Sequence, residues 1–400
     1  MKWDQVKLKV VSILVGGYAF KSSNMTDTCL PNYLPVIKIG NVSISGTLDL
    51  KNVQYHKYTK DLEGYNIKVG DVLIAMTGAT VGKVSISSQN DLLLNQRVGL
   101  IRPKKDVITQ RYLHHALCNA IFYEYCQNTA GGGAQGNISP SQILEYSIPL
   151  PPLHIQEQIA DTLDKADALR RKDQELLTKY DELAQAIFYD MFGDPVRNEK
   201  DWEVKKLKEI SIKIHSGNTP MGGSNVYVEK GITFFRSQNV WKNRLDYDDI
   251  AYLDEKTHKS MSKSSLHHRD ILMTKTGRIN TENSSLGRAA IFLGNDNTAN
   301  VNGHVYLIRL QKGEVNEFVL HILTTKEYRN LIREVCVGGI DKRQLNKDHI
   351  EQFPIIYPPL HLQGMFVNKL LLLQKQKNHL EVTAKESENL FNKLMNLNFS

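Results

Sequence analysis

The chain of 400 residues repeats most of its sequence pattern in its second half. Two segments return at an offset of 199 residues: Trp3–Ile13 as Trp202–Ile212, and Gly70–Gly78 as Arg269–Gly277. Two later segments return at an offset of 207: Asn95–Pro103 as Asn302–Leu310, and Ile148–His154 as Ile355–His361. Solenoid repeats have periods of roughly 20–50 residues, so a period of half the chain predicts one large module built twice. The rise in the offset predicts a net insertion of eight residues between Gly277 and Asn302.

The first part of each copy is predicted to be a mixed α+β globule. Short apolar or alternating runs bounded by Gly, Asn, Asp and Pro favour strands. They lie at 10–17, 34–44, 71–76, 83–88 and 97–103, and again at 210–214, 232–240, 270–275, 288–294 and 304–310. A helical segment follows the last strand of each set, at 110–126 and 317–335.

The segment Met76–Ser85, MTGATVGKVS, has some features of a phosphate-binding loop. Such a loop needs G-x-x-x-x-G-K-[S/T]. Here Gly78 and Gly82 are one residue too close, and Val84 stands where the hydroxyl residue belongs. The counterpart in the second copy carries the insertion. Because a hairpin tolerates a longer turn and a nucleotide cradle does not, we expect a hairpin.

The second part of each copy is predicted to be a long helix. After Pro151-Pro152 there is no Gly or Pro until Gly193, which indicates a helix with a start and a stop signal. A 4-3 spacing gives the seam Ile159, Leu163, Ala166, Arg170, Asp173, Leu177, Tyr180, Ala184, Ile187 and Met191. The same spacing 207 residues later gives Phe366, Leu370, Leu373, Lys377, Leu380, Ala384, Ser387, Phe391, Leu394 and Asn398. Both are coiled-coil seams. Arg170 and Lys377 either fix the register or are basic side chains that reach out to solvent.

These patterns divide the chain into a globule at 1–150, a helix at 151–193, a second globule at 194–357 and a helix at 358–400. Two matched seams bury each other most simply as an antiparallel coiled coil with a pseudo-two-fold axis, which places the globules at opposite ends. Each helix spans roughly 58 Å. That scale suits duplex DNA, on which half-sites recur about every 34–36 Å.

Loops that differ between the copies supply the candidate DNA contacts. The loops at 21–29 and 131–137 in the first copy correspond to 216–225 and 338–346 in the second. All four are rich in side chains that reach phosphates and base edges. Arg97 and His304 occupy matching strand starts, and Lys83 and Arg288 end matching turns; each is either a DNA contact or an ordinary surface residue. The candidate DNA-binding residues are Lys21, Ser22, Asn24, Lys83, Gln96, Arg97, Gln135, Ser216, Asn218, Thr219, Lys275, Arg278, Arg288, His304 and Arg343.

The doubled segments GDVLIAMTG, NQRVGLIRP and GGGAQGNISPSQILEYSIPLPPLHIQEQIA, together with HSGNTP, resemble the specificity subunit of type I restriction-modification systems. The resemblance covers essentially the whole chain. It implies that each globule is a target recognition domain that reads one half of a bipartite, asymmetric site on double-stranded DNA. It also implies that the helices act as the spacer. The second helix start departs from the pattern, since LHLQGMF replaces LHIQEQI.

The resemblance implies partners as well. Two methylation subunits bind the helices and carry adenine N6-methylation with S-adenosylmethionine. Restriction subunits join that complex and carry ATP-driven translocation and cleavage, with Mg²⁺. We expect no cofactor in this chain.

The sequence itself favours a non-catalytic subunit. The only Asp-Pro pair, Asp194-Pro195, lacks the aromatic residue of an adenine methyltransferase loop, and there is no G-x-G-x-x-G. We expect the pairs His114-His115 and His267-His268 to be structural or surface residues and not metal ligands, and Asp71 and Asp270 to make turns at strand starts.

The net charge, the cysteine spacing and the hydropathy of the chain bear on its partners and its location. A formal charge of +7 permits a polyanionic partner. The four cysteines form no C-x-x-C pair, and no apolar run approaches a spanning helix, so we expect a cytoplasmic protein with no membrane partner. The alternatives are the specificity subunit of a type IIB-like system, a non-catalytic coiled-coil scaffold, and a self-sufficient enzyme.

Overall fold

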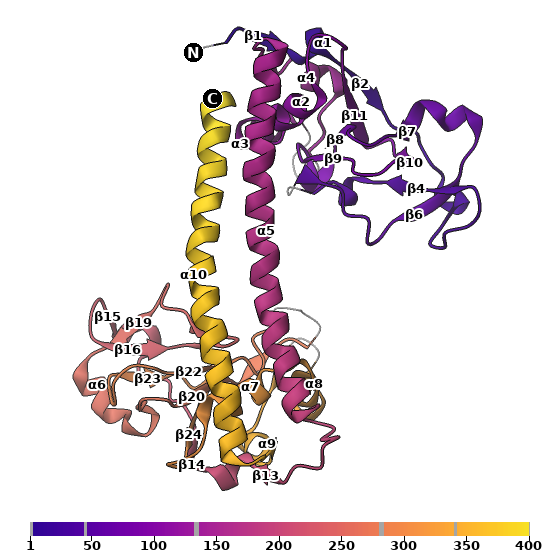
Figure 1. Cartoon of the computed structure of the whole chain (residues 1–400). Helices are drawn as coiled ribbons and strands as arrows, with labels where there is room; N and C mark the ends of the chain where they lie inside the picture. Colours follow the sequence, from indigo (N-terminus) through magenta and orange to yellow (C-terminus); the bar gives the residue numbers. More distant parts are fainter. Residues whose placement is uncertain (1–2, 44–45, 132–135, 280–283, 340–341, 400) are drawn as a thin grey trace. The chain divides into compact units, whose positions relative to one another are not determined.

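The computed structural model describes residues 3–43, 46–131, 136–279, 284–339 and 342–399. The chain forms two compact units (Figure 1). Unit 1 comprises Met1–Glu175 with Leu380–Ser400, and unit 2 comprises Leu176–His379. The chain passes from one unit to the other only within two long helices, α5 (Leu153–Phe192) and α10 (Leu360–Phe399). Each unit therefore contains one globule and a segment of both helices.

Unit 1 contains a main sheet and a second sheet. The main sheet has the spatial order β2 (Ser12–Gly16), β11 (Val98–Pro103), β8 (Val72–Ala75), β9 (Val84–Ile86) and β5 (Gly46–Thr47). The second sheet has the order β3 (Met25–Thr26), β6 (Gln54–Lys57), β4 (Tyr33–Ile37), β10 (Leu92–Leu94) and β7 (Asn66–Ile67). A separate pair joins β1 (Gln5–Lys7) to β12 (Ser147–Pro149). Apolar residues of β8 and β11 are fully buried and form the centre of the core.

The helices of unit 1 share one apolar core with the main sheet and with Leu163 of α5. They are α1 (Leu8–Val11), α2 (Gln110–Leu117), α3 (Ala120–Thr129) and α4 (Pro140–Leu144). The predicted helical segment at 110–126 is therefore two helices. The break occurs because the Asn119 side chain accepts a hydrogen bond from the backbone N–H of Phe122 and so caps a new helix.

Unit 2 repeats this plan. Its main sheet has the order β14 (Ser211–Ser216), β24 (Val305–Leu310), β20 (Ile271–Thr274) and β22 (Ala289–Ile291). Its second sheet has the order β15 (Tyr227–Val228), β19 (Ala251–Leu253), β16 (Ile232–Phe235) and β23 (Ala299–Val301). The smaller sheets are β17 (Val240–Trp241) with β18 (Arg244–Leu245), β13 (Val204–Lys206) with β27 (Pro354–Ile356), and β21 (Thr276–Gly277), β26 (Lys342–Gln344) and β25 (Val337–Gly339). The helices are α6 (Glu255–Ser260), α7 (Asn316–Leu323), α8 (Lys326–Val335) and α9 (Lys347–Glu351).

The insertion in the second copy lies mostly in one hairpin turn. On the first strand of the hairpin, Leu73 matches Leu272 at the sequence offset of 199. Their partners across the hairpin are Ser85 and Ala290, which differ by 205. The longer turn of unit 2 contains the additional strand β21, and in unit 1 residues 76–83 form the turn between β8 and β9. The expectation of a hairpin at this position is confirmed.

In unit 1 the segments of α5 and α10 pack antiparallel. The Ser387 hydroxyl donates to Asp173 Oδ2 at 2.8 Å, and the guanidinium of Arg170 lies over the Phe391 ring at 5.0 Å. A step forward along α5, from residue 170 to 173, is thus matched by a step backward along α10. Arg170 also donates to Glu388 at 3.2 Å, so it makes ion pairs within the seam and does not simply reach into solvent.

The segments in unit 2 pack in the same sense. Lys377 Nζ donates to Asp181 at 2.7 Å, and the rings of Phe188 and Phe366 lie 5.4 Å apart. Every position of the two predicted seams is buried or half-buried. The predicted fold class, a mixed α+β protein with an internal repeat and an antiparallel coiled coil, is confirmed.

Both long helices start in the same way. The buried side-chain amides of Gln156 and Gln363 each donate at 2.8 Å to the carbonyl of the first proline before their helix, Pro151 or Pro358. The departure of LHLQGMF from LHIQEQI therefore leaves this start unchanged, because the glutamine is shared.

Candidate nucleic-acid interface

The main sheet of each unit has one end at which the variable loops leave. In unit 1 the strand β2 ends opposite the start of β11, and β8 ends opposite the start of β9. The turns at 17–24, 76–83 and 95–97 all leave from that end. In unit 2 the same pairing brings together the turns at 217–220 and 302–304 and the described residues 275–279 and 284–288 of a third turn. We call these two groups of turns the loop ends of unit 1 and unit 2.

A glycine in each unit allows two turns of the loop end to pass closely. A Cβ atom added to Gly17 would lie 2.0 Å from the carbonyl oxygen of Asn95, and one added to Gly217 would lie 2.2 Å from that of Val301. Real Cβ atoms do not approach backbone oxygens so closely, so any other residue would push the two turns apart. The shared glycine thus fixes the spacing of the turns that carry the candidate residues.

At the loop end of unit 1, the exposed side chains of Gln96 and Arg97 lie beside the segment that leads to Lys21. The backbone N–H of Gln96 donates to Tyr18 O at 2.9 Å. Three further candidates on that segment, Lys21, Ser22 and Asn24, are exposed. Lys83 ends the β8–β9 turn and is half-buried. Gln135 lies outside the described residues.

At the loop end of unit 2, candidate residues form hydrogen bonds to the backbone of neighbouring turns. The N–H of Lys275 donates to His304 O at 2.8 Å, and the Ser216 hydroxyl donates to Gly303 O at 3.0 Å. Asn218 N–H donates to Val301 O at 3.2 Å. The structure therefore brings these candidates onto one surface.

The remaining candidates of unit 2 lie on or beside its hairpins. Arg343 pairs with Gly277 across β21 and β26, and Arg278 is the exposed residue that follows. Thr219 is exposed. Arg288 differs from the rest, because its guanidinium packs over the ring of Trp241 at 3.8 Å. Sequence reasoning missed Trp241; the available signal was an aromatic residue among cations in the stretch NVWKNR.

Each unit also contains a buried ion pair at matching positions. Arg309 holds Asp270 through two hydrogen bonds of 2.8 and 2.7 Å, and Arg102 holds Asp71 through two of 3.2 and 2.8 Å. Both aspartates also accept a backbone N–H within their own turn, as expected for strand starts. The turns were thus predicted correctly, whereas the arginine partners were not.

The two pairs of adjacent histidines differ in environment: His114 and His115 are buried, whereas His267 and His268 form hydrogen bonds through their backbone. His115 Nε2 lies 2.6 Å from Asp164 Oδ1. Burial, followed by the neighbouring charge of His115, lowers the pKa of His114 to about 4. The backbone N–H groups of His267 and His268 bond to Asp270 and Asp296. Within the described ranges no three metal-ligating side chains gather into a cluster.

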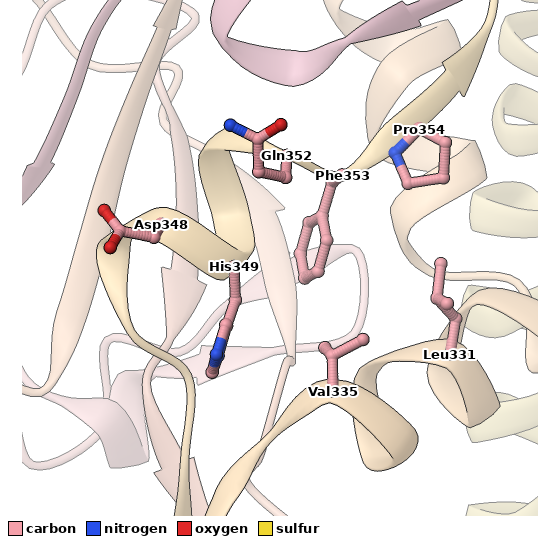
Figure 2. Close-up of a pocket in the computed structure, with 7 residues that line it drawn as sticks. All are labelled: Leu331, Val335, Asp348, His349, Gln352, Phe353 and Pro354. Atoms are coloured by element: carbon pink, nitrogen blue, oxygen red, sulfur yellow. The ribbon is translucent and has the colours of Figure 1, made fainter.

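A pocket of about 240 Å³ opens in unit 2 between α8 and α9 (Figure 2). Its walls are mainly apolar and its lining residues are Leu331, Val335, Asp348, His349, Gln352, Phe353 and Pro354. None of the candidate residues lines it. In unit 1 the corresponding place, between α3 and α4, is filled by Tyr125, whose hydroxyl donates to Gln142 O at 2.8 Å and whose ring lies 4.9 Å from that of Tyr146. The pocket is therefore not a feature shared by the two modules.

The arrangement as a whole defines a class of protein: a duplicated recognition module in which a common framework presents two different sets of polar loops. The comparisons with known proteins agree with this description. The profile of the family described as Type I restriction modification DNA specificity domain matches residues 1–179 and 199–387. The chain belongs to this family.

Curated relatives and solved structures extend the match over most of the chain. The StySPI specificity subunit of Salmonella potsdam is 21% identical over 92% of this chain and 81% of its own length. The MjaIX specificity subunit of Methanocaldococcus jannaschii is 26% identical over 89% of this chain and 83% of its own length. The crystal structure of the S subunit from M. genitalium aligns with a TM-score of 0.61 at 15% identity, covering 100% of this chain and 96% of that one, which shows a common fold. None of the helices in the described part of the chain has the length and hydropathy that crossing a membrane requires.

Proposed function

We propose that this chain is the DNA-recognition subunit of a type I restriction-modification complex. The globule at 1–150 reads one half of a bipartite, asymmetric site, and the globule at 194–357 reads the other half. The helices at 151–193 and 358–400 act as the spacer. Partner subunits supply the chemistry: two methylation subunits modify adenine at N6, and restriction subunits cleave.

One observation carries the proposal. The two units share the framework, including the close-approach glycines Gly17 and Gly217, yet the turns at their loop ends have different sequences. A repeated scaffold with different loops is suited to reading two different short sequences, because base contacts come from side chains on the loops. The candidate residues contribute amides, hydroxyls and cations, which bind base edges and phosphates.

The test is a genome-wide map of modified adenines in cells with and without this gene. We expect one bipartite motif to lose methylation when the gene is removed. Co-purification identifies the catalytic partners and separates a type I complex from a type IIB-like system. Duplex binding that is sequence-specific and falls steeply with salt excludes a scaffold, and a chain without such binding would instead be one.

A further inference from the structure

Tyr18 and Asn218 occupy the same backbone position in the two units. The backbone N–H of Tyr18 donates to Leu94 O at 2.8 Å, and that of Asn218 donates to Val301 O at 3.2 Å. Each residue directly follows the close-approach glycine of its unit. The pairing of β2 with β11 and of β14 with β24 gives the same alignment, because a register shift adds one residue to β14. Tyr18, which the sequence analysis did not select, is therefore the counterpart of the candidate DNA-binding residue Asn218.

Tyr18 lies at the loop end of unit 1 among exposed candidate residues. It is 38% exposed. Its carbonyl oxygen accepts the backbone N–H of Gln96 at 2.9 Å, so Tyr18 lies beside the exposed residues Gln96 and Arg97. In the described part of the chain, no group forms a hydrogen bond with the Tyr18 hydroxyl. A phenolic hydroxyl both donates and accepts hydrogen bonds, and this capacity is therefore free for a ligand.

Aromatic neighbours hold the Tyr18 ring in place. The ring packs edge-on against Phe20, with ring centres 4.9 Å apart, and against Tyr65, with ring centres 5.4 Å apart. Phe20 is itself buried, and its ring lies 4.8 Å from that of His56 on β6. Edge-to-face pairs of this kind are favourable arrangements of aromatic rings. Because the Tyr18 ring is already held, it loses little freedom when it contacts a ligand.

The shared framework does not require an aromatic residue at this position. In unit 2 the same backbone hydrogen bond is made by Asn218, which has no ring. Two residues further along the chain, unit 1 has Phe20 where unit 2 has Pro220. The aromatic pair of Tyr18 and Phe20 therefore belongs to the part of the loop end that differs between the units. Side chains that read different DNA sequences are expected in such loops.

We infer that Tyr18 contacts a base edge in the half-site read by unit 1, and that it is a specificity-determining residue. This inference rests on the proposed function. The hydroxyl can bond to a polar group of a base edge, and the ring can pack against a thymine methyl group. A tyrosine side chain is uncharged at neutral pH, whereas the neighbouring candidates Lys21 and Arg97 are cations. Loss of Tyr18 should therefore reduce discrimination between bases without reducing the attraction to phosphates.

The test measures binding of full-length variants to three duplexes: one with the mapped site, and two in which one or the other half-site is scrambled. Y18N introduces the residue that unit 2 has at this position. We expect Y18N to weaken binding to the intact site about 10-fold, as the loss of one base contact does. The slope of log affinity against log salt should stay unchanged, because no charge is lost. The weakening should persist on one scrambled duplex and disappear on the other, because Tyr18 contacts one half only.

Y18F then identifies the group that makes the contact, because it removes only the hydroxyl. A loss equal to that of Y18N assigns the contact to the hydroxyl, and binding equal to that of the wild type assigns it to the ring. Y33N is the matched control. Tyr33 is a half-buried tyrosine of unit 1 at the start of β4, and β4 runs parallel to β10, whose far end leads into the loop end. Y33N should bind all three duplexes as the wild type does.

Hydrogen exchange in β2 and β11 should be the same in Y18N and the wild type, because asparagine fits the matching position of unit 2. The inference is overturned if β2 and β11 lose protection in Y18N, since Tyr18 is then a structural residue. It is also overturned if Y18N binds the intact site as tightly as Y33N, if Y18N loses the same factor on both scrambled duplexes, or if its salt slope falls. A wild-type chain that binds the intact site no better than the scrambled duplexes would overturn the proposed function itself, and this inference with it.

Discussion

Replacing Arg309 with methionine tests how strongly the buried ion pair holds unit 2 together. Arg309 donates two hydrogen bonds to Asp270 and a third, of 3.2 Å, to Ser265 O. The Asp270 side chain is 1% exposed and that of Arg309 is 16% exposed. Methionine fills the volume of the aliphatic stem but leaves a buried carboxylate without its cation. Such a loss costs about 3–5 kcal/mol of unfolding free energy.

Unit 1 provides a matched comparison. Arg102 holds Asp71 in the same way, and the Asp71 side chain is only 6% exposed, but that of Arg102 is 31% exposed, so its removal opens a path for water to the carboxylate. We expect R102M to cost about 1–3 kcal/mol, less than R309M. The double change D270N with R309M removes both charges while the asparagine still accepts the His267 N–H. It should recover about 1–3 kcal/mol relative to R309M alone.

Hydrogen exchange read by mass spectrometry measures this in the full chain, because peptides from each main sheet report on its own unit. R309M should lose protection in β20 and β24 while β8 and β11 stay protected. Equal losses in the two units under R309M would refute the assignment of the pair to one unit. A double variant as unstable as R309M would show that the buried charge is not the cause.

Three further outcomes follow from the same structure. Burial and then the charge of Lys242 lower the pKa of His321 to about 4. Because this folded-state pKa is below the ordinary value near 6.5, the contribution of neutral His321 to the unfolding free energy is full above pH 6.5 and is lost as the pH falls toward 4. Unit 2 should lose about 2 kcal/mol between pH 7 and pH 5, and H321F, whose ring fits between Phe188 and Phe366, should abolish that part of the pH dependence in denaturant titrations. Inserting one heptad into both helices, after Glu175 and after His379, lengthens each by about 10.5 Å and preserves the seam; methylation mapping should show a spacer about three base pairs longer, and an unchanged spacer would contradict the role of the helices. Replacing Lys21 and Asn24 by alanine should alter one half-site, and replacing Asn218 and Thr219 the other; a change in both halves from either pair would contradict two-headed reading.

The internal repeat predicted the framework well because it depends on buried residues. The seam positions from Ile159 to Met191 recur with the period of a helix. Burial of one face of a helix favours apolar side chains at that period. The hairpin at 76–83 was predictable for a related reason, since two apolar strands flank a turn that tolerates different lengths in the two copies. These features depend on local pattern and on comparison of one half of the chain with the other.

Side-chain partners far apart in sequence were not predictable. Asp270 was assigned to a turn from its neighbours, and it does make that turn, but its stronger partner Arg309 is 39 residues away. The break between α2 and α3 was missed because Asn119 also fits within a helix by composition. The DNA-contact candidates remain predictions, since exposed loop residues are not selected by packing and their pattern does not report what they bind.

The duplication also distinguishes positions that packing constrains from surface positions that it leaves free to differ. Positions that keep the same residue in both copies are explained by packing within each unit: Gly17 and Gly217 permit close approach, and Gln156 and Gln363 start the long helices. Positions that differ at the surface carry no such constraint, and Tyr18 against Asn218 is the clearest case. Unlike surface loops on a shared framework are what the proposed asymmetric DNA site requires, because base contacts come from side chains on the loops.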